Sequence, residues 1–170
     1  MRIISIVGLK QAGKTTLLVA LARELNRQGK RIGSIVSSAD GQGVDLRASD
    51  TSWHFPKGSG QTATKEQLPT VVATAEGIDP EALARAHFGG HDLVFAEGFV
   101  EAPLPKIEIY RKAGGLPPLI QSASTPGLWV ALVTDTEFAG LPCPALKFTD
   151  TMWLQLLGSL AWDRAKILSA

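Results

Sequence analysis

The feature that most constrains this chain is a glycine-rich segment near its N-terminus, GLKQAGKT at residues 8–15. Gly8, four further residues and then Gly13-Lys14-Thr15 give the spacing G-x-x-x-x-G-K-[ST] of a phosphate-binding loop. Glycine allows backbone angles that turn successive N–H groups toward an anion, and the helix that follows adds its positive end. Lysine contributes a mobile positive charge and threonine a hydroxyl ligand for Mg²⁺. The segment therefore predicts a nucleotide site containing Lys14 and Thr15.

The flanking sequence favours the strand, loop and helix that such a segment requires. Residues 2–7 are mostly apolar and rich in isoleucine and valine, as is typical of a buried parallel strand. Apolar residues then recur at helical spacing, and Gly29 can end that helix. A second short strand at residues 32–37 completes a crossover unit, so the two strands should be parallel. A plain glycine turn with a solvated lysine is the alternative, and these flanks disfavour it.

Length and composition indicate a globular protein. The 170 residues suit one domain spanning 1–170, and the hydrophobic fraction of 45% is ordinary for a soluble protein. A net charge of +1 gives no electrostatic reason to expect nucleic acid or membrane as a partner. The single cysteine, Cys143, cannot form an intramolecular disulfide, and the N-terminus does not resemble a signal peptide. We therefore expect a cytoplasmic protein.

A second informative stretch is HDLVFAEG at residues 91–98, an apolar strand that ends in Glu97 and Gly98. In proteins with a phosphate-binding loop, such a strand lies beside the strand that carries the loop. Its terminal acid can then reach Mg²⁺ directly or through water. We predict that Glu97 is this acid, the alternative being a strand-end glutamate that faces solvent.

The remaining elements complete an α/β pattern. Further strands are expected at residues 69–75, 106–111, 128–135 and 145–148. Residues 106–111 alternate polar and apolar and follow two prolines, which suggests a strand with one exposed face, at an edge or outside the main sheet. Helices should begin at Asp79 and Asp150, each acting as the N-terminal cap. The predicted fold is a three-layer P-loop NTPase fold, a mostly parallel sheet flanked by helices. The polar segment 38–60 should lie over the phosphate site.

Four segments together resemble the molybdopterin-guanine dinucleotide biosynthesis protein B (MobB) family: GLKQAGKTTL, the ASD after the second strand, FAEGF and PLPKIEIYR. The resemblance covers essentially the whole chain. The combination of AEGF with PLPKIE is much more specific than the phosphate-binding loop, which many unrelated families share.

The resemblance implies a GTP-binding accessory, or adapter, protein with weak GTPase activity that uses GTP and Mg²⁺. Such a protein assists the enzyme that attaches GMP to molybdopterin to form molybdopterin guanine dinucleotide. The implied partners are a molybdopterin guanylyltransferase and, as a second candidate, a molybdopterin-loaded insertion protein. The family forms homodimers, and the resemblance points to PLPKIEIYR as the paired or exchanged strand.

The resemblance also carries over site residues. Gly8, Gly13, Lys14, Thr15 and Thr16 correspond to phosphate and Mg²⁺ contacts, with Ala12 inside the same loop. Glu97 corresponds to the acid of the magnesium site, so that Lys14 and Glu97 are the candidate catalytic groups.

Other candidate contacts rest on weaker patterns. Lys10 and Gln11 belong to the predicted nucleotide site and can either approach the γ-phosphate or point to solvent. The guanine-reading N-K-x-D motif is absent from the chain. Asp135, at the end of the strand VALVTD, is the best residue to accept hydrogen bonds from a guanine edge, although capping a turn is an equal alternative.

The long polar loop departs from the family. Where the family has a lysine–histidine pair, this chain has Ser37-Ser38-Ala39-Asp40, and the G-K-D-S/T pattern is here Ala48-Ser49-Asp50-Thr51. Asp50 also resembles the second magnesium-binding aspartate of dethiobiotin synthetase. We predict that Asp50 is a magnesium ligand together with Thr15 and Glu97, with a cap or turn acid as the alternative.

Two other functions remain open from the sequence. One is an ATP-dependent small-molecule kinase or ligase of the dethiobiotin-synthetase type, for which Arg47, Lys57 and Lys65 lack diagnostic spacing. The other is a pure adaptor that binds nucleotide without turnover. Because no residue stands out as an arginine finger or a water-orienting glutamine, we expect at most slow GTP hydrolysis.

Overall fold

The computed structural model describes residues 1–37, 68–73 and 77–169. The strands are β1 (Arg2–Val7), β2 (Ile32–Ser37), β3 (Thr70–Ala73), β4 (Leu93–Glu97), β5 (Lys106–Tyr110), β6 (Trp129–Thr134), β7 (Ala145–Lys147) and β8 (Lys166–Ile167). The α-helices are α1 (Lys14–Arg27), α2 (Pro80–His87) and α3 (Trp153–Arg164). Three short 3₁₀ helices join β5 to β6: η2 (Lys112–Gly114), η3 (Leu119–Ser122) and η4 (Pro126–Leu128). The predicted loop 38–60, with Asp50, lies outside the described residues.

The strands form one sheet in the order β3-β2-β4-β1-β5-β6-β7, and all neighbours along this path are parallel. The last strand, β8, pairs antiparallel with Arg2 and Ile3 of β1. One side of β1 is occupied by β4. The other side is shared by β8, beside residues 2 and 3, and β5, beside residues 5–7. The prediction of a mostly parallel α/β sheet is confirmed.

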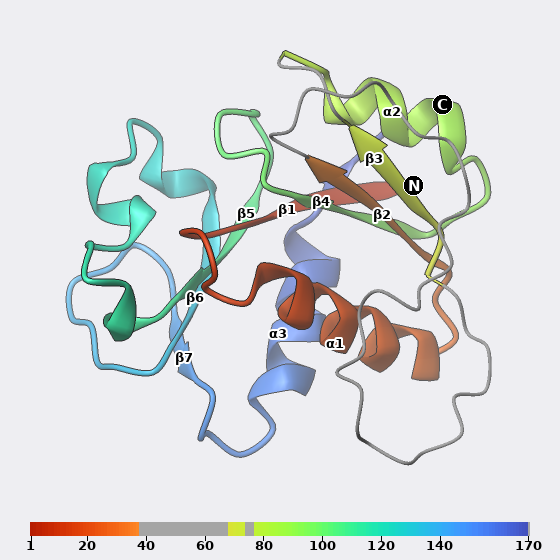
Figure 1. The fold of residues 1–170 in the computed structure, drawn as a ribbon. Helices are drawn as coiled ribbons and strands as arrows, with labels where there is room; N and C mark the ends of the chain where they lie inside the picture. Colours follow the sequence, from red (N-terminus) through yellow and green to blue (C-terminus); the bar gives the residue numbers. More distant parts are fainter. Residues whose placement is uncertain (38–67, 74–76, 170) are drawn as a thin grey trace.

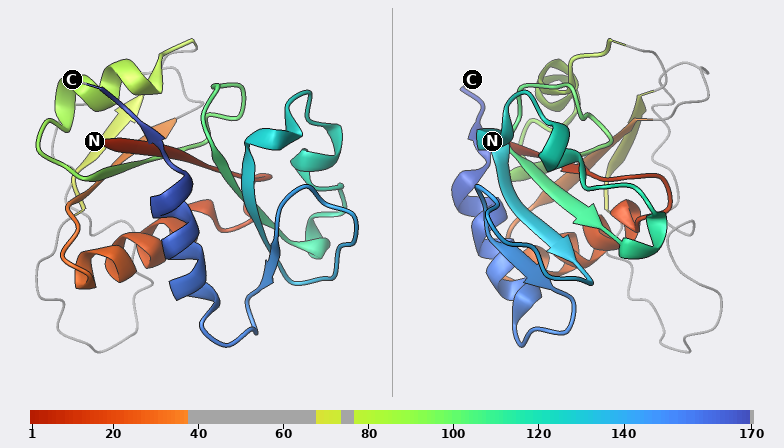
Figure 2. Two further views of the ribbon diagram at one scale, coloured as in Figure 1. Left: turned by 180° about the vertical axis from the view of Figure 1, so that it is seen from behind. Right: turned by 90° about the vertical axis from the view of Figure 1, so that its left-hand side faces the viewer.

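Alternate residues of β1 point into two different hydrophobic clusters, and this alternation defines the layers. Ile4 and Ile6 pack in the cluster that contains the apolar residues of α1 and α3, whereas Ile3 packs in the cluster beneath α2. Figures 1 and 2 show α1 and α3 side by side on one face of the sheet and α2 on the other. The predicted three-layer arrangement is therefore present.

The helix α2 begins as predicted. Asp79 caps it by accepting a hydrogen bond from the Glu81 N–H at 2.9 Å. Its other end packs closely on β2, because a Cβ added at Gly33 would lie 2.3 Å from the ring of Phe88. Within the described residues, none of the helices combines the length and the apolar character that crossing a bilayer requires.

The start of α3 differs from the prediction. Asp150 does not cap the helix; its carboxylate accepts a hydrogen bond from the Lys147 N–H at 2.8 Å and so closes the turn after β7. The helix begins after Met152, which has a φ of 61° and makes no side-chain cap. The acid thus caps the turn before the helix, and the chain reaches the helix through Met152 in the left-handed region.

The prediction for β5 is also wrong. This strand lies inside the sheet between β1 and β6, and all five of its residues are buried. Its polar members, Lys106 and Glu108, are 1% and 0% exposed. Both find hydrogen-bond partners in the segments that cover this face, so alternation does not mark a solvent-facing side here. Because β1 and β6 occupy both edges of β5, this strand offers no edge for pairing with a second chain.

Candidate nucleotide-binding site

The loop between β1 and α1 has the backbone geometry that its glycines predict. Gly8 has a φ of 150°, and Gly13, with a φ of 102°, is the N-terminal cap residue of α1. Gln11 also lies in the left-handed region, with a φ of 64°. The Ala12 N–H donates to the Leu9 carbonyl at 3.2 Å, which closes the turn. The chain therefore curls at the positive end of α1, where backbone N–H groups favour an anion.

The loop rests on a residue that sequence reasoning did not identify. A Cβ added at Gly8 would lie 2.4 Å from the carbonyl oxygen of Ile109 and 3.1 Å from its Cγ2. At Gly13, the Cδ1 of Ile109 would be 3.5 Å away. Thus β5 supports both glycines of the loop. The required absence of a side chain at Gly8 comes from packing as well as from the phosphate chemistry.

Lys14 is held over the loop. Its Nζ donates to the carbonyl oxygens of Gly8 at 3.2 Å and Leu9 at 3.1 Å. These bonds fold the side chain back along the curl that begins at α1. The ammonium group therefore lies at the loop, where a phosphate oxygen can accept from it.

Thr15 and Glu97 meet although 82 residues separate them in sequence. The Thr15 hydroxyl is 2.9 Å from Oε1 and 3.0 Å from Oε2 of Glu97. Glu97 is only 7% exposed and ends β4, in register with Ile6 of β1. The next residue, Gly98, turns the chain with a φ of 89° and donates its N–H to the Ile6 carbonyl. The structure thus brings the two predicted metal ligands together.

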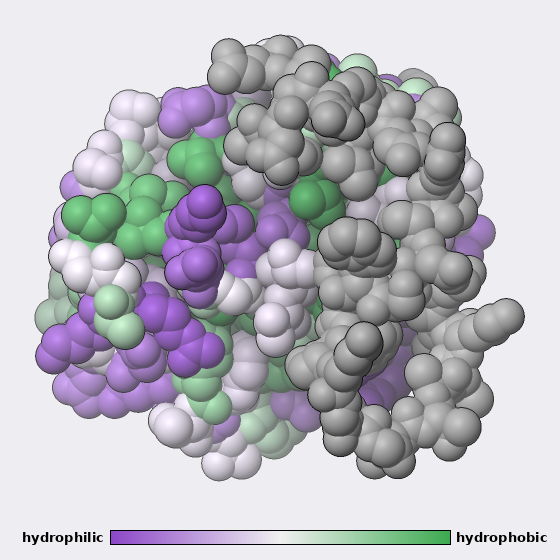
Figure 3. Space-filling model, in the orientation of Figure 1, coloured by the Kyte–Doolittle hydropathy of each residue, from purple (hydrophilic) through white to green (hydrophobic). Residues whose placement is uncertain are grey.

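The remaining candidate residues of this region differ in exposure. Lys10, Gln11 and Thr16 are exposed, whereas Ala12 is buried. Figure 3 shows hydrophilic residues gathered over the position of this loop in Figure 1.

Asp135 lies just after β6, at the edge of the sheet where β1 and β4 also end, because these strands are parallel. It is exposed, and its Oδ1 accepts a hydrogen bond from the Lys112 N–H at 3.0 Å. This bond joins the start of η2 to the end of β6. The turn-capping alternative is therefore present in the structure, and a guanine contact remains a prediction.

The donor set fits a hard divalent cation. Mg²⁺ prefers oxygen ligands and commonly uses one or two protein groups, with phosphate and water completing its shell. Thr15 supplies a hydroxyl and Glu97 a carboxylate at one place. Among the described residues, no group of three or more histidine, cysteine, aspartate or glutamate side chains could hold a metal ion. The third predicted ligand, Asp50, lies outside those residues.

A family model agrees with this geometry. The model for MobB, molybdopterin guanine dinucleotide synthesis protein B, matches residues 3–135, which include the loop, Glu97 and Asp135. The chain belongs to the MobB family. The resemblance drawn from FAEGF and PLPKIEIYR is therefore confirmed.

Known relatives bear the same family name. The chain is 33% identical over 114 residues to the molybdopterin-guanine dinucleotide biosynthesis adapter protein of Haemophilus influenzae, a match that covers 65% of this chain and 64% of the relative. The match thus spans less than two thirds of that protein's length.

Solved structures share the fold at lower identity. The Bacillus subtilis MobB structure has a TM-score of 0.58 at 19% identity, covering 94% of this chain and 97% of that one. The MobB homologue of Bacillus stearothermophilus has a TM-score of 0.57 at 18% identity, covering 94% and 98%. These matches support the same α/β architecture.

Proposed function

We propose that this protein is a GTP-binding adapter in the formation of molybdopterin guanine dinucleotide, where it assists the attachment of GMP to molybdopterin. The observation that carries the nucleotide part is the contact between Thr15 and Glu97 directly behind the phosphate-binding loop. The adapter part is supported by family membership and by the printed name of the Haemophilus influenzae relative. A molybdopterin guanylyltransferase is the proposed main partner, and a molybdopterin-loaded insertion protein is a second one.

The proposed binding mode uses charge and position. The loop N–H groups and the N-terminal end of α1 would surround the phosphates, and Lys14 would exchange its two carbonyl partners for phosphate oxygens. Thr15 and Glu97 would hold Mg²⁺, which neutralises charge on the phosphates when it is bound. Thr16, next along α1, is exposed and available to a phosphate oxygen.

Hydrolysis should be slow in this proposal. Lys10 and Gln11 are exposed side chains of the loop, and neither is fixed by a hydrogen bond among the described residues. A group that is not held in place orients water poorly, and positioning is most of what phosphoryl transfer requires from a protein. We therefore propose at most a weak GTPase whose site is completed by a partner.

Guanine selection is proposed for Asp135. Its Oδ1 accepts from the Lys112 N–H, and its second oxygen remains available to a donor on the guanine edge. Asp135→Asn should then reduce the preference for GTP over ATP in calorimetric titrations. Equal affinities of the wild-type protein for GTP and ATP would instead favour the ATP-dependent kinase or ligase function.

The decisive experiment tests GTP binding and association with the guanylyltransferase separately. Lys14→Ala should weaken GTP binding by about 10-fold or more, because a charge-assisted contact to the phosphates is lost. Lys166→Ala is the control, since Lys166 lies on β8 beside the opposite end of β1. Co-purification with the guanylyltransferase, with and without GTP, then tests the adapter role. GTP binding that survives in Lys14→Ala, or failure to associate with the guanylyltransferase, would contradict the proposal.

Homodimer formation and a cytoplasmic location complete the proposal. The homodimer rests on the family resemblance, and the cytoplasmic location on the single cysteine, Cys143, which fits a reducing compartment. The edges of the described sheet path are β3 and β7, so a pairing of sheets would use one of these strands and not β5. Sedimentation analysis would give the mass in solution, and a monomer at all concentrations would remove the dimer from the proposal.

A further inference from the structure

A cavity lies on the face of the sheet opposite α1 and α3. Its volume is about 410 Å³, within the range of small-molecule sites. One side is the chain that follows β4, including Glu101 and Ala102, and the other is residues 119–128. Lys106 and Trp129 also line it. We call this space the Lys106 cavity, and none of the residues predicted to bind nucleotide lines it.

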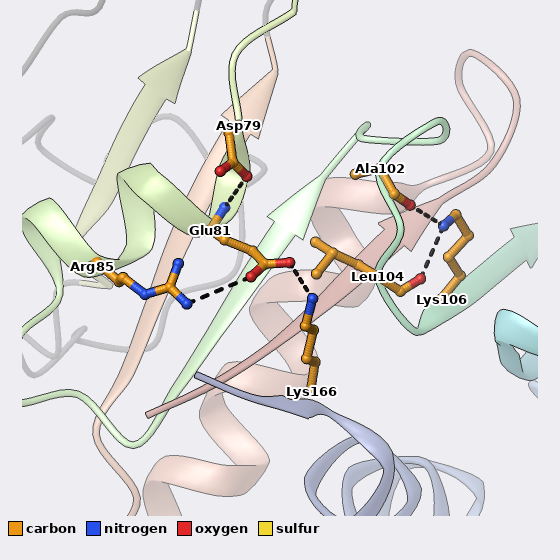
Figure 4. Close-up of polar contacts among 7 residues, drawn as sticks. All are labelled: Asp79, Glu81, Arg85, Ala102, Leu104, Lys106 and Lys166. Atoms are coloured by element: carbon orange, nitrogen blue, oxygen red, sulfur yellow. Dashed lines mark hydrogen bonds and ion pairs between the residues drawn. The ribbon is translucent and has the colours of Figure 1, made fainter. Parts of the chain in front are cut away.

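The cavity contains a buried ammonium group with a donor to spare. Lys106 is 1% exposed, and its Nζ donates to the carbonyl oxygens of Ala102 at 2.5 Å and Leu104 at 2.9 Å. Figure 4 shows these two bonds, which reach from β5 to the segment before it. An ammonium has three donors, so one remains. No carboxylate forms an ion pair with Lys106 among the described residues.

Burial makes this charge costly. It lowers the pKa of Lys106 from its ordinary value, an effect that the negative charge of Glu101 opposes. The Trp129 ring lies 5.5 Å from Nζ and supplies part of the compensation. An acceptor inside the cavity would supply the rest, since a buried charge is stable only when it is paired and hydrogen-bonded.

The opposite wall offers hydroxyl groups and is held firmly. Ser124 and Thr125 line the cavity, and neither side-chain hydroxyl makes a hydrogen bond within the described part of the chain. The segment that carries them is anchored by Glu108, whose carboxylate accepts from the N–H groups of Leu119 and Ile120 at 2.6 and 3.0 Å. This carboxylate also accepts from the Trp129 indole at 2.8 Å. Both carboxylate oxygens of Glu108 are therefore engaged, and the residue fixes this wall of the cavity.

We propose that the Lys106 cavity binds the anionic group of a small organic molecule, a phosphate monoester or a carboxylate, through Lys106, Ser124 and Thr125. The site is separate from the phosphate-binding loop and does not depend on the proposed GTP site. Glu101, exposed at the rim, opposes the bound anion. Its charge therefore gives the proposal a directional test.

The test uses phenyl phosphate and benzoate as probes, both observed through their aromatic protons by saturation-transfer NMR. All titrations are made in the Lys14→Ala background, which weakens phosphate binding at the loop. Lys106→Met should weaken binding by about tenfold or more, since the only cation of the site is lost. Glu101→Gln should strengthen binding by roughly threefold, the scale of one charge acting through a partly hydrated cavity. Lys112→Met, an exposed lysine outside the cavity, is the control and should change nothing.

Binding of one probe alone identifies its chemical class, and binding of both supports an anion site of either class. Absence of binding in this background, or equal affinity in Lys106→Met, would overturn the proposal. If Lys106→Met does not fold, the Glu101→Gln titration decides, and an unchanged affinity there counts against the site. GTP binding of Lys106→Met with Lys14 intact is measured separately, so that failure of this site and failure of the nucleotide site are distinguishable.

Discussion

At the scale of single residues, two constraints meet at Gly8. The phosphate-binding motif requires a flexible backbone there, and the carbonyl of Ile109 leaves no room for a Cβ. The second constraint comes from backbone, so a change of rotamer cannot relieve it. A glycine that serves both chemistry and packing should be less tolerant of substitution than one that serves backbone angle alone.

Gly8→Ala should therefore lower both the stability of the protein and its affinity for nucleotide. The matched control is Gly29→Ala, because Gly29 also has a positive φ, 78°, but has nothing within 4 Å of an added Cβ. We expect a loss of roughly 1 kcal/mol for the control, from backbone strain alone, with nucleotide affinity unchanged. Urea denaturation and calorimetry measure the two quantities, and equal losses in both variants would show that Ile109 does not constrain the loop.

Glu97 allows a test of the metal site. Glu97→Gln keeps the size of the side chain and an acceptor for the Thr15 hydroxyl but removes the charge that attracts Mg²⁺. The gain in GTP affinity on adding Mg²⁺ should fall by about tenfold, roughly 1.4 kcal/mol. Affinity measured in excess chelator should change little or rise, because a negative charge near the phosphates is lost. An undiminished response to Mg²⁺ would remove Glu97 from the metal site.

At the scale of elements, β5 connects the two faces of the sheet. Ile109 supports the phosphate-binding loop on the face of α1, while Lys106 and Glu108 point to the other face and fix the segments that cover it. A strand with buried polar side chains is stable here because each charge meets backbone donors or acceptors. Both polar residues belong to the PKIE motif that helped to reveal the family.

Glu108 predicts a dependence of stability on pH. Burial raises its pKa above the ordinary 4.5, an effect that the hydrogen bonds from Leu119, Ile120 and Trp129 only partly offset. Because the pKa of Glu108 is higher in the folded than in the unfolded protein, its contribution to the free energy of unfolding is fully present below pH 4.5. This contribution is lost as the pH rises through the pKa of the folded state. Glu108→Gln should cost about 1–3 kcal/mol, since its amide would face N–H donors. The difference in free energy of unfolding between wild type and Glu108→Gln should therefore become smaller toward neutral pH.

Glu137→Gln is the control for that pH series. Glu137 is exposed, and its hydrogen bond with Lys147 lowers its pKa. Its small contribution to stability is therefore present at neutral pH and is lost as the pH falls. Denaturant titrations from pH 4 to 7 compare the variants. A difference between wild type and Glu108→Gln that is constant or widens with pH would contradict the predicted sign.

At the scale of the whole molecule, the C-terminal strand β8 contacts both the sheet, through β1, and the helix α2. Beyond its pairing with β1, Lys166 of β8 donates to Glu81 of α2 at 2.6 Å, and Glu81 also lies 3.7 Å from Arg85 (Figure 4). This ion pair is partly exposed, so its contribution should be small. The backbone pairing of β8 with β1 and the apolar cluster beneath α2 should stabilise the C-terminal segment more than this ion pair does.

Glu81→Gln should accordingly lower the free energy of unfolding by no more than about 1 kcal/mol. Leu168→Ala should cost more, about 2–4 kcal/mol, because Leu168 is 5% exposed and packs in the cluster beneath α2. Both values come from denaturant unfolding. The reverse order would mean that the ion pair, and not the apolar contact, holds the C-terminal segment.

The sequence was sufficient for features that depend on local pattern. The loop motif with its flanks predicted the first crossover, and the apolar run before Glu97 placed this acid beside β1. The interior place of β5 could not be predicted, because the groups that satisfy Lys106 and Glu108 come from other segments through tertiary contacts. The start of α3 was missed because the Asp150 carboxylate bonds the Lys147 N–H before it, and not an N–H of the helix. The contact of Ile109 with the phosphate-binding loop could not be predicted, because the sequence of an apolar strand does not show which segment packs on each residue.

One consequence concerns the phosphate-binding loop before nucleotide arrives. Lys14 already bonds the Gly8 and Leu9 carbonyls, and Thr15 already bonds Glu97. In the proposed site, an incoming nucleotide would therefore replace existing hydrogen-bond partners of Lys14 and Thr15. Such an exchange of hydrogen-bond partners returns little net free energy per bond.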